Sequence, residues 1–317
     1  MKIAYIFDQP LPGKEADQMQ LINTIAALSR HGCEVTLFLP ASNVDDLPTA
    51  DALREYYKID APFKLDCIHS IFPGPRIAEK VVHPLLCTTL LRKKLRTFDL
   101  VYSRNIPAIV TSLSTGMPTM YDTYRPWPIQ YAAMIPLFRL IFMDRNFLGI
   151  ALHSEYSRQA YISKGFDPHK LLTAHNGYDK RYYTPALSKG EARALTGLER
   201  DAKIAMYAGR ISMKKGLDHV LRLAQARPDV EFVFVGPGDE SGEFARAAQH
   251  LANCQIIGWQ PDDEAAELNG FNALIDDDER MNRLSNEAAK DAQNLTWDAR
   301  AEIIVDFMQR RLGEIRA

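Results

Sequence analysis

The sequence predicts an α/β protein made of two doubly wound, Rossmann-like domains facing each other across a cleft. The chain has 317 residues, more than one usual hydrophobic core needs. Apolar runs of strand length alternate with amphipathic segments of helical period, a pattern typical of βαβ units and a parallel sheet. The same alternation begins again near residue 203. We therefore expect one domain over residues 1–185 and a second over 186–317.

The first domain opens with a βαβ unit. "KIAYIF" predicts a strand, "ADQMQLINTIAALSR" places Leu21, Ile25 and Leu28 on one helical face, and "CEVTLFL" predicts the next strand. Ser154 and Gly165 bracket the helix "EYSRQAYISK" as its N-cap and its stop. Four further strands are expected at "FDLVYSRN", "PTMYDTY", "FLGIALHS" and "LLTAHNG".

The second domain has a shorter series of elements. Strands are expected at "KIAMYAG", "VEFVFVG" and "CQIIGW", with helices at "KGLDHVLRLAQA" and "EFARAAQHLA". The remaining stretch is helical and poor in strands, so this domain is predicted to be shortened. Its last helix is a candidate for packing back on the first domain. Because ligands of open parallel sheets bind beyond the carboxyl ends of the strands, the cleft between the domains is the expected site.

Composition excludes several classes of function. A formal net charge of −2 provides no global electrostatic case for nucleic acid. The four cysteines are scattered without a C-x-x-C pair, and no H-E-x-x-H pattern occurs, so neither a disulfide framework nor a metal site is expected. The amino-terminal apolar run is too short for a signal-peptide core, which predicts a cytoplasmic protein.

One stretch suggests contact with a membrane surface. The segment from Trp127 to Ser154 is apolar but is interrupted by Pro136, Arg139 and Asp144, so no span is expected, although an interfacial surface is possible. "LLRKKLRTFD" places four basic residues in about one helical turn, where they could meet anionic headgroups at the inner membrane face. A solvated helix face explains the same charges.

A basic turn follows the first strand of the second domain. Arg210 comes just past the strand, and Lys214 and Lys215 stand where the next helix begins. The free N–H groups of a helix amino terminus carry a partial positive charge. Arginine can hold a phosphate bidentately and lysine adds a compact charge, so this pattern suits a diphosphate. The alternative is a basic turn that is simply solvated.

Three other strand ends carry candidate binding residues. Gly236 in "FVFVGPGDESG" marks a turn of close approach, although the dinucleotide fingerprint is incomplete. Gly13 in "DQPLPGKEADQ" stands at a strand-to-helix turn where a ligand could approach the backbone, and a plain turn fits equally. In "YDTYRPWP", Asp122 and Tyr124 could bind a hydroxyl-rich substrate, or Asp122 could stabilise its own turn.

Taken together, "AHNGYD", "MYAGRISMKKGLDHVLRLA", "EFVFVGPGDE" and "IIGWQPDDEAAEL" resemble, in order and spacing, the retaining glycosyltransferases of family 4, which have the GT-B fold. The resemblance implies a metal-independent hexosyltransferase without a cofactor. Residues 1–185 would form the acceptor side and 186–317 the domain that binds the nucleotide sugar.

The resemblance also implies a substrate and roles for individual residues. A sugar would pass from a UDP- or GDP-linked donor to a polysaccharide, a lipid-linked or another cell-envelope acceptor. Arg210 and Lys215 would grip the donor diphosphate as catalytic residues. The substrate-binding positions implied are Gly13, Asp122, Tyr124, Asn176, Gly209, Gly236 and Trp259.

The chain departs from the family pattern at two places. Tyr124 stands where the family usually has a histidine. The segment carrying the family's paired glutamates is absent, because Asn269 is followed directly by Gly270, and a second shortening falls between Ile275 and Asp276. Two alternatives therefore remain open: a GT-B binding or scaffold module without donor chemistry, and a GT-B epimerase of UDP-sugars, for which the acid and base carboxylates cannot be placed.

Overall fold

The structure is a computed structural model that describes residues 1–13, 15–41, 48–69, 92–183, 189–196, 203–238, 242–257 and 294–316, and the single positions 81, 82, 84, 85, 89 and 290. The chain forms two compact units. One consists of Met1–Tyr178 together with Leu295–Ala317, and the other of Asp179–Asn294. The structure thus divides the chain after residue 178, whereas the sequence analysis placed the boundary after residue 185. The last helix of the chain belongs to the first unit.

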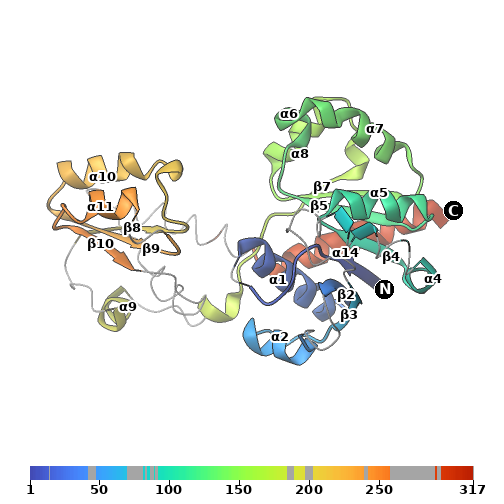
Figure 1. The fold of residues 1–317 in the computed structure, drawn as a ribbon, viewed down its shortest axis with the longest axis horizontal. Helices are drawn as coiled ribbons and strands as arrows, with labels where there is room; N and C mark the ends of the chain where they lie inside the picture. The colour runs from blue at the N-terminus through green and yellow to red at the C-terminus, as the bar shows by residue number, and fades with distance from the viewer. Residues whose placement is uncertain are drawn as a thin grey trace. The chain divides into compact units, whose positions relative to one another are not determined.

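The first unit is built on a parallel sheet with the strand order β3-β2-β1-β4-β5-β6-β7 (Figure 1). This order reverses beside β1, so the carboxyl ends of β1 and β4 form the switch point at which doubly wound sheets bind ligands. The strands are β1 (Lys2–Ile6), β2 (Glu34–Ala41), β3 (Lys64–His69), β4 (Leu100–Ser103), β5 (Thr119–Thr123), β6 (Phe147–Leu152) and β7 (Leu171–Thr173).

Helices cover both faces of this sheet because the strands carry apolar side chains on both of their faces. Ile3 and Tyr5 pack with α1 (Ala16–Arg30), α2 (Ala50–Tyr56) and α14 (Trp297–Arg316). Ala4 and Ile6 belong to a separate cluster on the opposite face. The helices of that face include α4 (Arg92–Leu95), α5 (Ile106–Ser114), α7 (Ile135–Met143) and α8 (Glu155–Ile162), with the short α6 (Trp127–Gln130) preceding α7.

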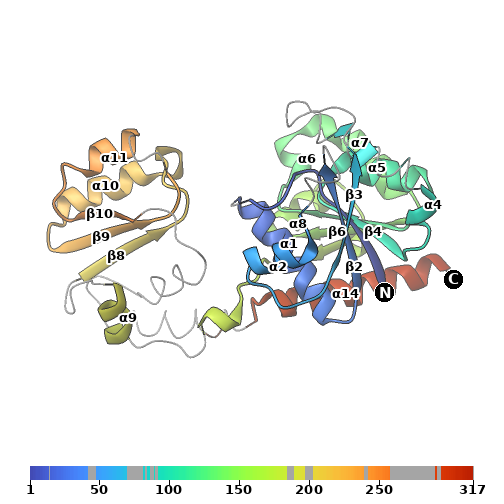
Figure 2. The same ribbon diagram turned by 60° about the horizontal axis from the view of Figure 1, so that its bottom comes forward.

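Helix α14 returns to the first unit and runs beside α1, as Figure 2 shows. It buries Ala301, Ile304, Met308 and Leu312, which recur at helical spacing and so form one apolar stripe. The segment before it is held by a bridge between Tyr178 and Thr296. This helix of twenty residues, the last of the chain, therefore completes the hydrophobic core of the first unit.

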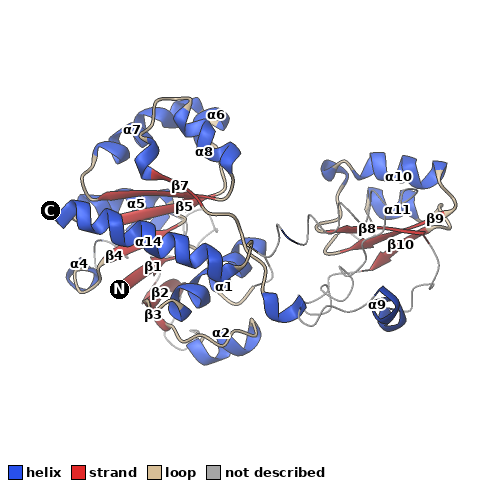
Figure 3. Cartoon of the chain, turned by 180° about the vertical axis from the view of Figure 1, so that it is seen from behind, coloured by secondary structure: helices blue, strands red, loops and turns tan. Residues whose placement is uncertain are grey.

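The second unit has a three-stranded parallel sheet in its described residues, in the order β10-β9-β8. Helix α10 buries Leu217, Leu221 and Ala224 in the same cluster as Phe232 and Phe234 of the central strand. In Figure 3, α10 and α11 lie on one side of the sheet and α9 lies on the other. The elements are α9 (Lys189–Thr196), β8 (Lys203–Ala208), α10 (Leu217–Ala226), β9 (Val230–Val235), α11 (Glu243–Ala248) and β10 (Cys254–Ile257).

The predicted α/β fold class is confirmed, with one strand more than expected in the first unit. Strand β3 was not predicted. The shortening expected between residues 269 and 276 lies outside the described residues. Within the described ranges, every helix is too short or too polar to cross a bilayer.

Candidate functional site

The basic turn of the second unit lies at the carboxyl end of β8. Arg210, Lys214 and Lys215 are all exposed. The two lysines belong to a short 3-10 turn (Met213–Lys215) that begins at Ser212, whose hydroxyl accepts a hydrogen bond from the backbone N–H of Lys214. Gly216 then takes the left-handed conformation, φ 74°, and α10 starts after it. The predicted cationic turn is present, and its lysines precede the helix rather than opening it.

Gly209 and Gly236 hold the ends of β8 and β9 against each other. Both have positive φ, 145° and 135°, which disfavours any side chain. A Cβ on Gly236 would lie 2.2 Å from the carbonyl oxygen of Gly209. The Gly209 N–H donates to the Val235 carbonyl at 2.8 Å. In this structure both glycines are explained by the approach of two backbones, and contact with a nucleotide sugar stays a prediction.

Gly13 is enclosed by the protein's own side chains. Its N–H donates to the Tyr57 hydroxyl at 2.8 Å, and that hydroxyl donates to the Gly13 carbonyl at 2.9 Å. A Cβ on Gly13 would lie 2.1 Å from Oε1 of Gln18, which accepts from Glu15 N–H in the capping box of α1. Gln18 therefore occupies the space beside Gly13, which agrees with the plain turn that the sequence also allowed, and contact of Gly13 with a ligand stays a prediction.

Asp122 is the centre of a buried polar network, which corrects its predicted role in binding hydroxyl groups of a substrate. Its side chain is 3% exposed. Tyr102 donates to its Oδ2 at 2.6 Å, Arg300 Nη2 donates to the same oxygen at 2.8 Å, and His153 Nε2 lies 2.5 Å from Oδ1. Strand alternation turns Asp122 toward the face covered by α14, the face that also holds Met120 and Tyr102. The carboxylate thus joins β4, β5, β6 and α14.

The electrostatics of this network favour the ionised carboxylate. Burial by itself would raise the pKa of Asp122, but the Arg300 guanidinium and then the His153 imidazole hold that pKa well below its usual range. Burial, followed by the negative charge of Asp122, raises the pKa of the Tyr102 phenol well above its usual value. Tyr102 and Arg300 therefore act as fixed hydrogen-bond donors to the Asp122 carboxylate.

The residues at the solvent side of this network come from the ends of β5, β6 and β7. Tyr124 is 53% exposed, and its ring centroid lies 6.2 Å from that of His153. Arg125 stacks over Tyr124 at 5.2 Å. Nδ1 of His175 is 3.1 Å from the backbone oxygen of His153. Asn176 follows, and its buried Oδ1 has no hydrogen-bond partner in the described part of the chain.

Sequence reasoning identified part of this arrangement. Asp122, Tyr124 and Asn176 were singled out from the sequence. Arg300 was missed, because no local pattern marks an arginine on the apolar face of a distant helix. Trp259 lies outside the described residues. Among the residues that are described, no group of three or more His, Cys, Asp or Glu side chains could hold a metal ion.

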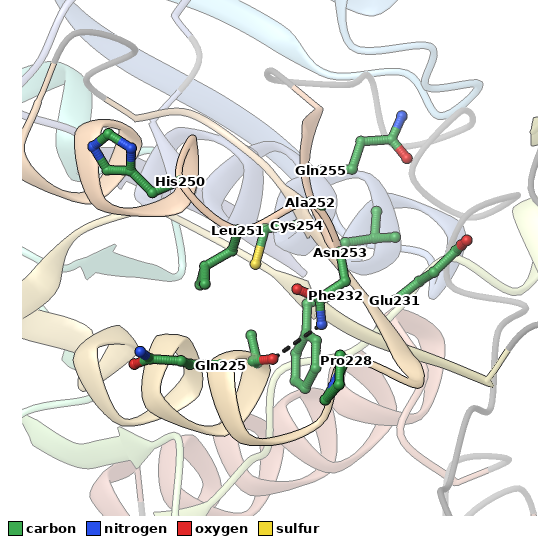
Figure 4. Close-up of a pocket in the computed structure, with 12 residues that line it drawn as sticks. Gln225, Pro228, Glu231, Phe232, His250, Leu251, Ala252, Asn253, Cys254 and Gln255 are labelled. Atoms are coloured by element: carbon green, nitrogen blue, oxygen red, sulfur yellow. Dashed lines mark hydrogen bonds between the residues drawn. The ribbon is translucent and has the colours of Figure 1, made fainter.

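The second unit contains a hollow of about 690 Å³, whose lining residues are shown in Figure 4 and do not include the basic turn. Pro228 and Leu251 line it and precede β9 and β10, so it opens at the amino ends of the strands. Asn253 closes this end by donating to the carbonyls of Ala224, Arg227 and Val230. Because doubly wound sheets bind ligands at the carboxyl ends, this hollow is not the candidate site.

Comparison with solved structures shows that the chain has a GT-B-like fold. HepE of Anabaena in complex with UDP-glucose aligns with a TM-score of 0.56 at 17% identity, over 100% of this chain and 99% of that one. UDP-GlcNAc 2-epimerase from Neisseria meningitidis bound to UDP-GlcNAc aligns with a TM-score of 0.59 at 13% identity, over 98% and 100%. At these identities the likeness shows the fold.

Curated relatives named as glycosyltransferases match part of the chain. D-inositol 3-phosphate glycosyltransferase of Mycolicibacterium gilvum is 34% identical over 94 residues, 29% of this chain and 21% of the relative. The protein of the same name from Streptomyces scabiei is 38% identical over 108 residues, 30% of this chain and 24% of the relative. The chain thus spans about a fifth to a quarter of the length of these relatives. No protein-family model matches the chain.

Proposed function

We propose that the chain binds a nucleoside diphosphate sugar and transfers the sugar to an acceptor hydroxyl. The observation that carries this proposal is the exposed cationic turn at the carboxyl end of β8, with Arg210, Lys214 and Lys215 beside the amino end of α10. Local likeness to proteins named as glycosyltransferases supports it. Breaking the bond between sugar and phosphate places negative charge on the leaving diphosphate, which fixed cations stabilise.

We infer that the donor carries UDP. Fold neighbours bound to UDP, UDP-glucose and UDP-GlcNAc support this choice over GDP. In the proposed reaction Arg210 holds the diphosphate bidentately and Lys215 adds a point charge, without a metal or cofactor. Gly209 and Gly236 leave the ends of β8 and β9 without side chains next to the proposed position of the diphosphate.

The acceptor is proposed to be lipid-linked or otherwise part of the cell envelope, with the protein held at a membrane surface. Helix α7 exposes Leu140 and Met143, which are 67% and 81% exposed, next to the exposed Arg139. Apolar side chains beside cationic ones suit the boundary of an anionic bilayer. The protein should sediment with phosphatidylserine vesicles, and Leu140→Glu with Met143→Glu should abolish this sedimentation. Equal recovery of both proteins with the vesicles would contradict the membrane contact.

The transferase proposal is tested by measuring the turnover of variants with substitutions in the basic turn. UDP release from UDP-glucose should fall by on the order of a hundredfold in Arg210→Ala and in Lys215→Ala, as expected when one preorganised charge contact is lost. Arg222→Ala is the matched control, because this exposed arginine of α10 pairs with Asp218 of the same helix. Unchanged turnover in both test variants would refute the proposal. If calorimetry detects neither UDP nor GDP binding, the chain is a scaffold module instead.

An epimerase is the second candidate, and the full-length alignment with UDP-GlcNAc 2-epimerase favours it. An epimerase would invert one carbon of the sugar of UDP-GlcNAc and release no sugar. Proton NMR of UDP-GlcNAc incubated with the protein separates the two activities. Conversion to a second UDP-linked hexosamine supports the epimerase, whereas free UDP with a released or transferred sugar supports the transferase.

A further inference from the structure

A cavity of about 320 Å³ lies in the first unit at the amino end of β7. Its lining comes from α8, from β7 and the turn Pro168–Lys170 before it, and from α14. Every lining residue belongs to the first unit. Ligand pockets in proteins usually measure about 300–1,000 Å³, so this cavity suits a small ligand. It lies at the start of β7 and is therefore distinct from the carboxyl edge of the sheet.

Three nitrogen-bearing side chains line this cavity, one from each helical element. Arg158 comes from α8, His169 from the turn before β7, and Arg310 from α14. Helices α8 and α14 belong to core clusters on opposite faces of the sheet, so the cavity wraps around the sheet edge that β7 forms. The apolar part of the lining includes Leu171, Leu172 and Phe307. The cavity thus combines hydrogen-bond donors on several sides with an apolar wall.

Arg310 is held in place by stacking and is not bound by an acid. Its Cζ lies 5.5 Å from the ring centroid of Phe307, and that ring is 3% exposed, so it is a fixed platform. Arg310 makes no hydrogen bond or ion pair with another residue that the structure describes. A guanidinium carries five N–H donors. All five are therefore available to solvent or to a ligand.

The acidic side chains of this region are bound to other arginines. Glu314 also lines the cavity, and its carboxylate accepts a hydrogen bond from Arg311. Glu155 accepts from Arg158 Nη1 at 3.1 Å. Arg158 Nε donates to the Leu171 carbonyl at 3.3 Å, which holds this guanidinium against the edge strand. Its Nη2 makes no hydrogen bond in the described part of the chain, so Arg158 also retains donors.

Lys170 adds positive charge beside the cavity. Its ammonium donates to the carbonyls of Phe142 and Asp144, at 2.7 and 3.2 Å, and these acceptors are neutral. Burial, followed by the charge of Arg311, lowers the pKa of Lys170, and the carboxylates of Asp167 and Asp144 oppose this less strongly. Cations therefore outweigh anions around this amine.

We propose that the cavity binds the phosphate group of a small organic phosphate monoester. Arg158 and Arg310 donate to it from two sides and His169 from a third. A phosphate presents three acceptor oxygens in different directions, whereas a planar carboxylate is filled by one guanidinium fork. The apolar wall of Leu171, Leu172 and Phe307 receives the carbon part of the ester. This inference goes beyond the proposed function and does not depend on it.

Calorimetry with glycerol 3-phosphate tests the site in the full chain. Binding should be saturable, and Arg310→Gln should weaken it about ten- to hundredfold, as expected when a charged hydrogen-bond donor is lost. Arg310→Lys keeps the charge without the planar fork, so its loss should be smaller. The matched control is Arg316→Gln on the same helix, because this exposed arginine pairs with Asp99 and does not line the cavity. It should bind like the wild type.

The Arg210→Ala chain separates this cavity from the basic turn of the second unit, which also attracts phosphate. Glycerol 3-phosphate should slow hydrogen exchange in peptides from β7 and α14, because a ligand that binds only the folded site stabilises the elements it joins. The wild type and Arg210→Ala should both show this protection, and Arg310→Gln should lose it. Protection confined to the basic turn would overturn the inference.

A second arm distinguishes a soluble ester from a lipid headgroup. The protein is sedimented with phosphatidylcholine vesicles that do or do not contain phosphatidic acid, whose headgroup is also a phosphate monoester. Saturable binding of glycerol 3-phosphate that depends on Arg310 assigns the site to a soluble ester. If glycerol 3-phosphate does not bind but sedimentation requires both phosphatidic acid and Arg310, the ligand is the lipid headgroup.

The inference is overturned if neither arm depends on Arg310, or if Arg310→Gln and Arg316→Gln weaken binding equally. If Arg310→Gln does not fold, Arg310→Lys decides: weaker binding than in the wild type supports the site, and equal binding overturns it. Failure of the proposed function is recognised separately. A wild type that releases no UDP, yet binds glycerol 3-phosphate in a manner that depends on Arg310, retains this site.

Discussion

Replacing Arg300 with Met should destabilise the first unit by about 3–5 kcal/mol. The side chain of Arg300 is 2% exposed and that of Asp122 is 3% exposed, so the ion pair is screened by almost no water. Arg300 also donates to the carbonyls of Ala174 and His175. Methionine retains much of the apolar length of the side chain, so the loss comes from the charge and its hydrogen bonds.

The magnitude follows from what the substitution leaves behind. Asp122 would remain buried and ionised, with Tyr102 and His153 as its remaining partners. Breaking a buried pair by removing one partner costs about 3–5 kcal/mol, a large share of the 5–15 kcal/mol that stabilises a typical domain. Arg316 provides a matched control on the same helix: it pairs with Asp99 but is 64% exposed, so Arg316→Met should cost no more than about 1 kcal/mol.

Hydrogen exchange measured by mass spectrometry during urea titration is the appropriate assay, because peptides from β5 and β6 report the first unit separately from the second. The double variant Asp122→Asn with Arg300→Met should lose less stability than the sum of the two single variants, since it leaves no unpaired charge. If Arg300→Met shifts the protection of these peptides no more than Arg316→Met does, the buried pair does not stabilise the unit as argued.

Three further predictions concern stability. The pKa of Asp122 in the folded protein lies below the ordinary carboxyl value of about 3.9, so its contribution to the free energy of unfolding is complete above about pH 4 and is lost as the pH falls through the folded pKa. In urea titrations from about pH 5 to about pH 2, the free energy of unfolding should therefore fall more steeply for the wild type than for Asp122→Asn. Gly236→Ala should destabilise the second unit more than Gly116→Ala destabilises the first, as measured by urea titrations followed by hydrogen exchange. Both glycines have positive φ, but only at Gly236 would a Cβ lie 2.2 Å from a backbone oxygen. Equal losses of stability in the two variants would contradict this. Phe307→Ala should cost about 3–5 kcal/mol in the same assay, because this α14 side chain is 3% exposed in the core, and a loss below 1 kcal/mol would show that α14 is not firmly packed.

The alternation of apolar runs predicted most of the sheet, and the strand it missed shows the limit of that signal. Strand β3 has the sequence "KLDCIH" and forms the edge of the sheet, paired only with β2 among the described strands. An edge strand can carry charges such as Lys64 and Asp66 because one side of its backbone faces solvent. Its apolar positions are therefore too few and too widely spaced to distinguish it from a loop.

The local parts of the candidate site could be predicted, whereas the long-range parts could not. The basic turn after β8 follows from neighbouring residues, and so does the cap of α8 at Ser154, which accepts from the Ser157 N–H. The partners of Asp122 stand 20, 31 and 178 positions away in the sequence. No periodicity or spacing rule connects positions so distant, because their proximity is created by the strand order and by the return of α14.

Glycines at strand ends illustrate why a correct local pattern can have a different cause. Gly13 and Gly236 both follow strands, and the absence of a side chain at each is consistent with a ligand lying close to the backbone. In the structure Gln18 fills the space beside Gly13, and the carbonyl of Gly209 fills the space beside Gly236. A bare backbone therefore marks a close approach, while the identity of what approaches depends on the tertiary structure.

The polar network around Asp122 makes the carboxyl edge of the first sheet depend on the end of the chain. Arg300 is the only described residue of α14 that donates to Asp122, and the same guanidinium binds the backbone at Ala174 and His175, just before the chain leaves the first unit. The orientation of His153 thus requires both β5 and the returning helix. A substitution that loosens α14 without touching this edge, such as Phe307→Ala, should for this reason disturb the orientation of His153 as well as lower stability.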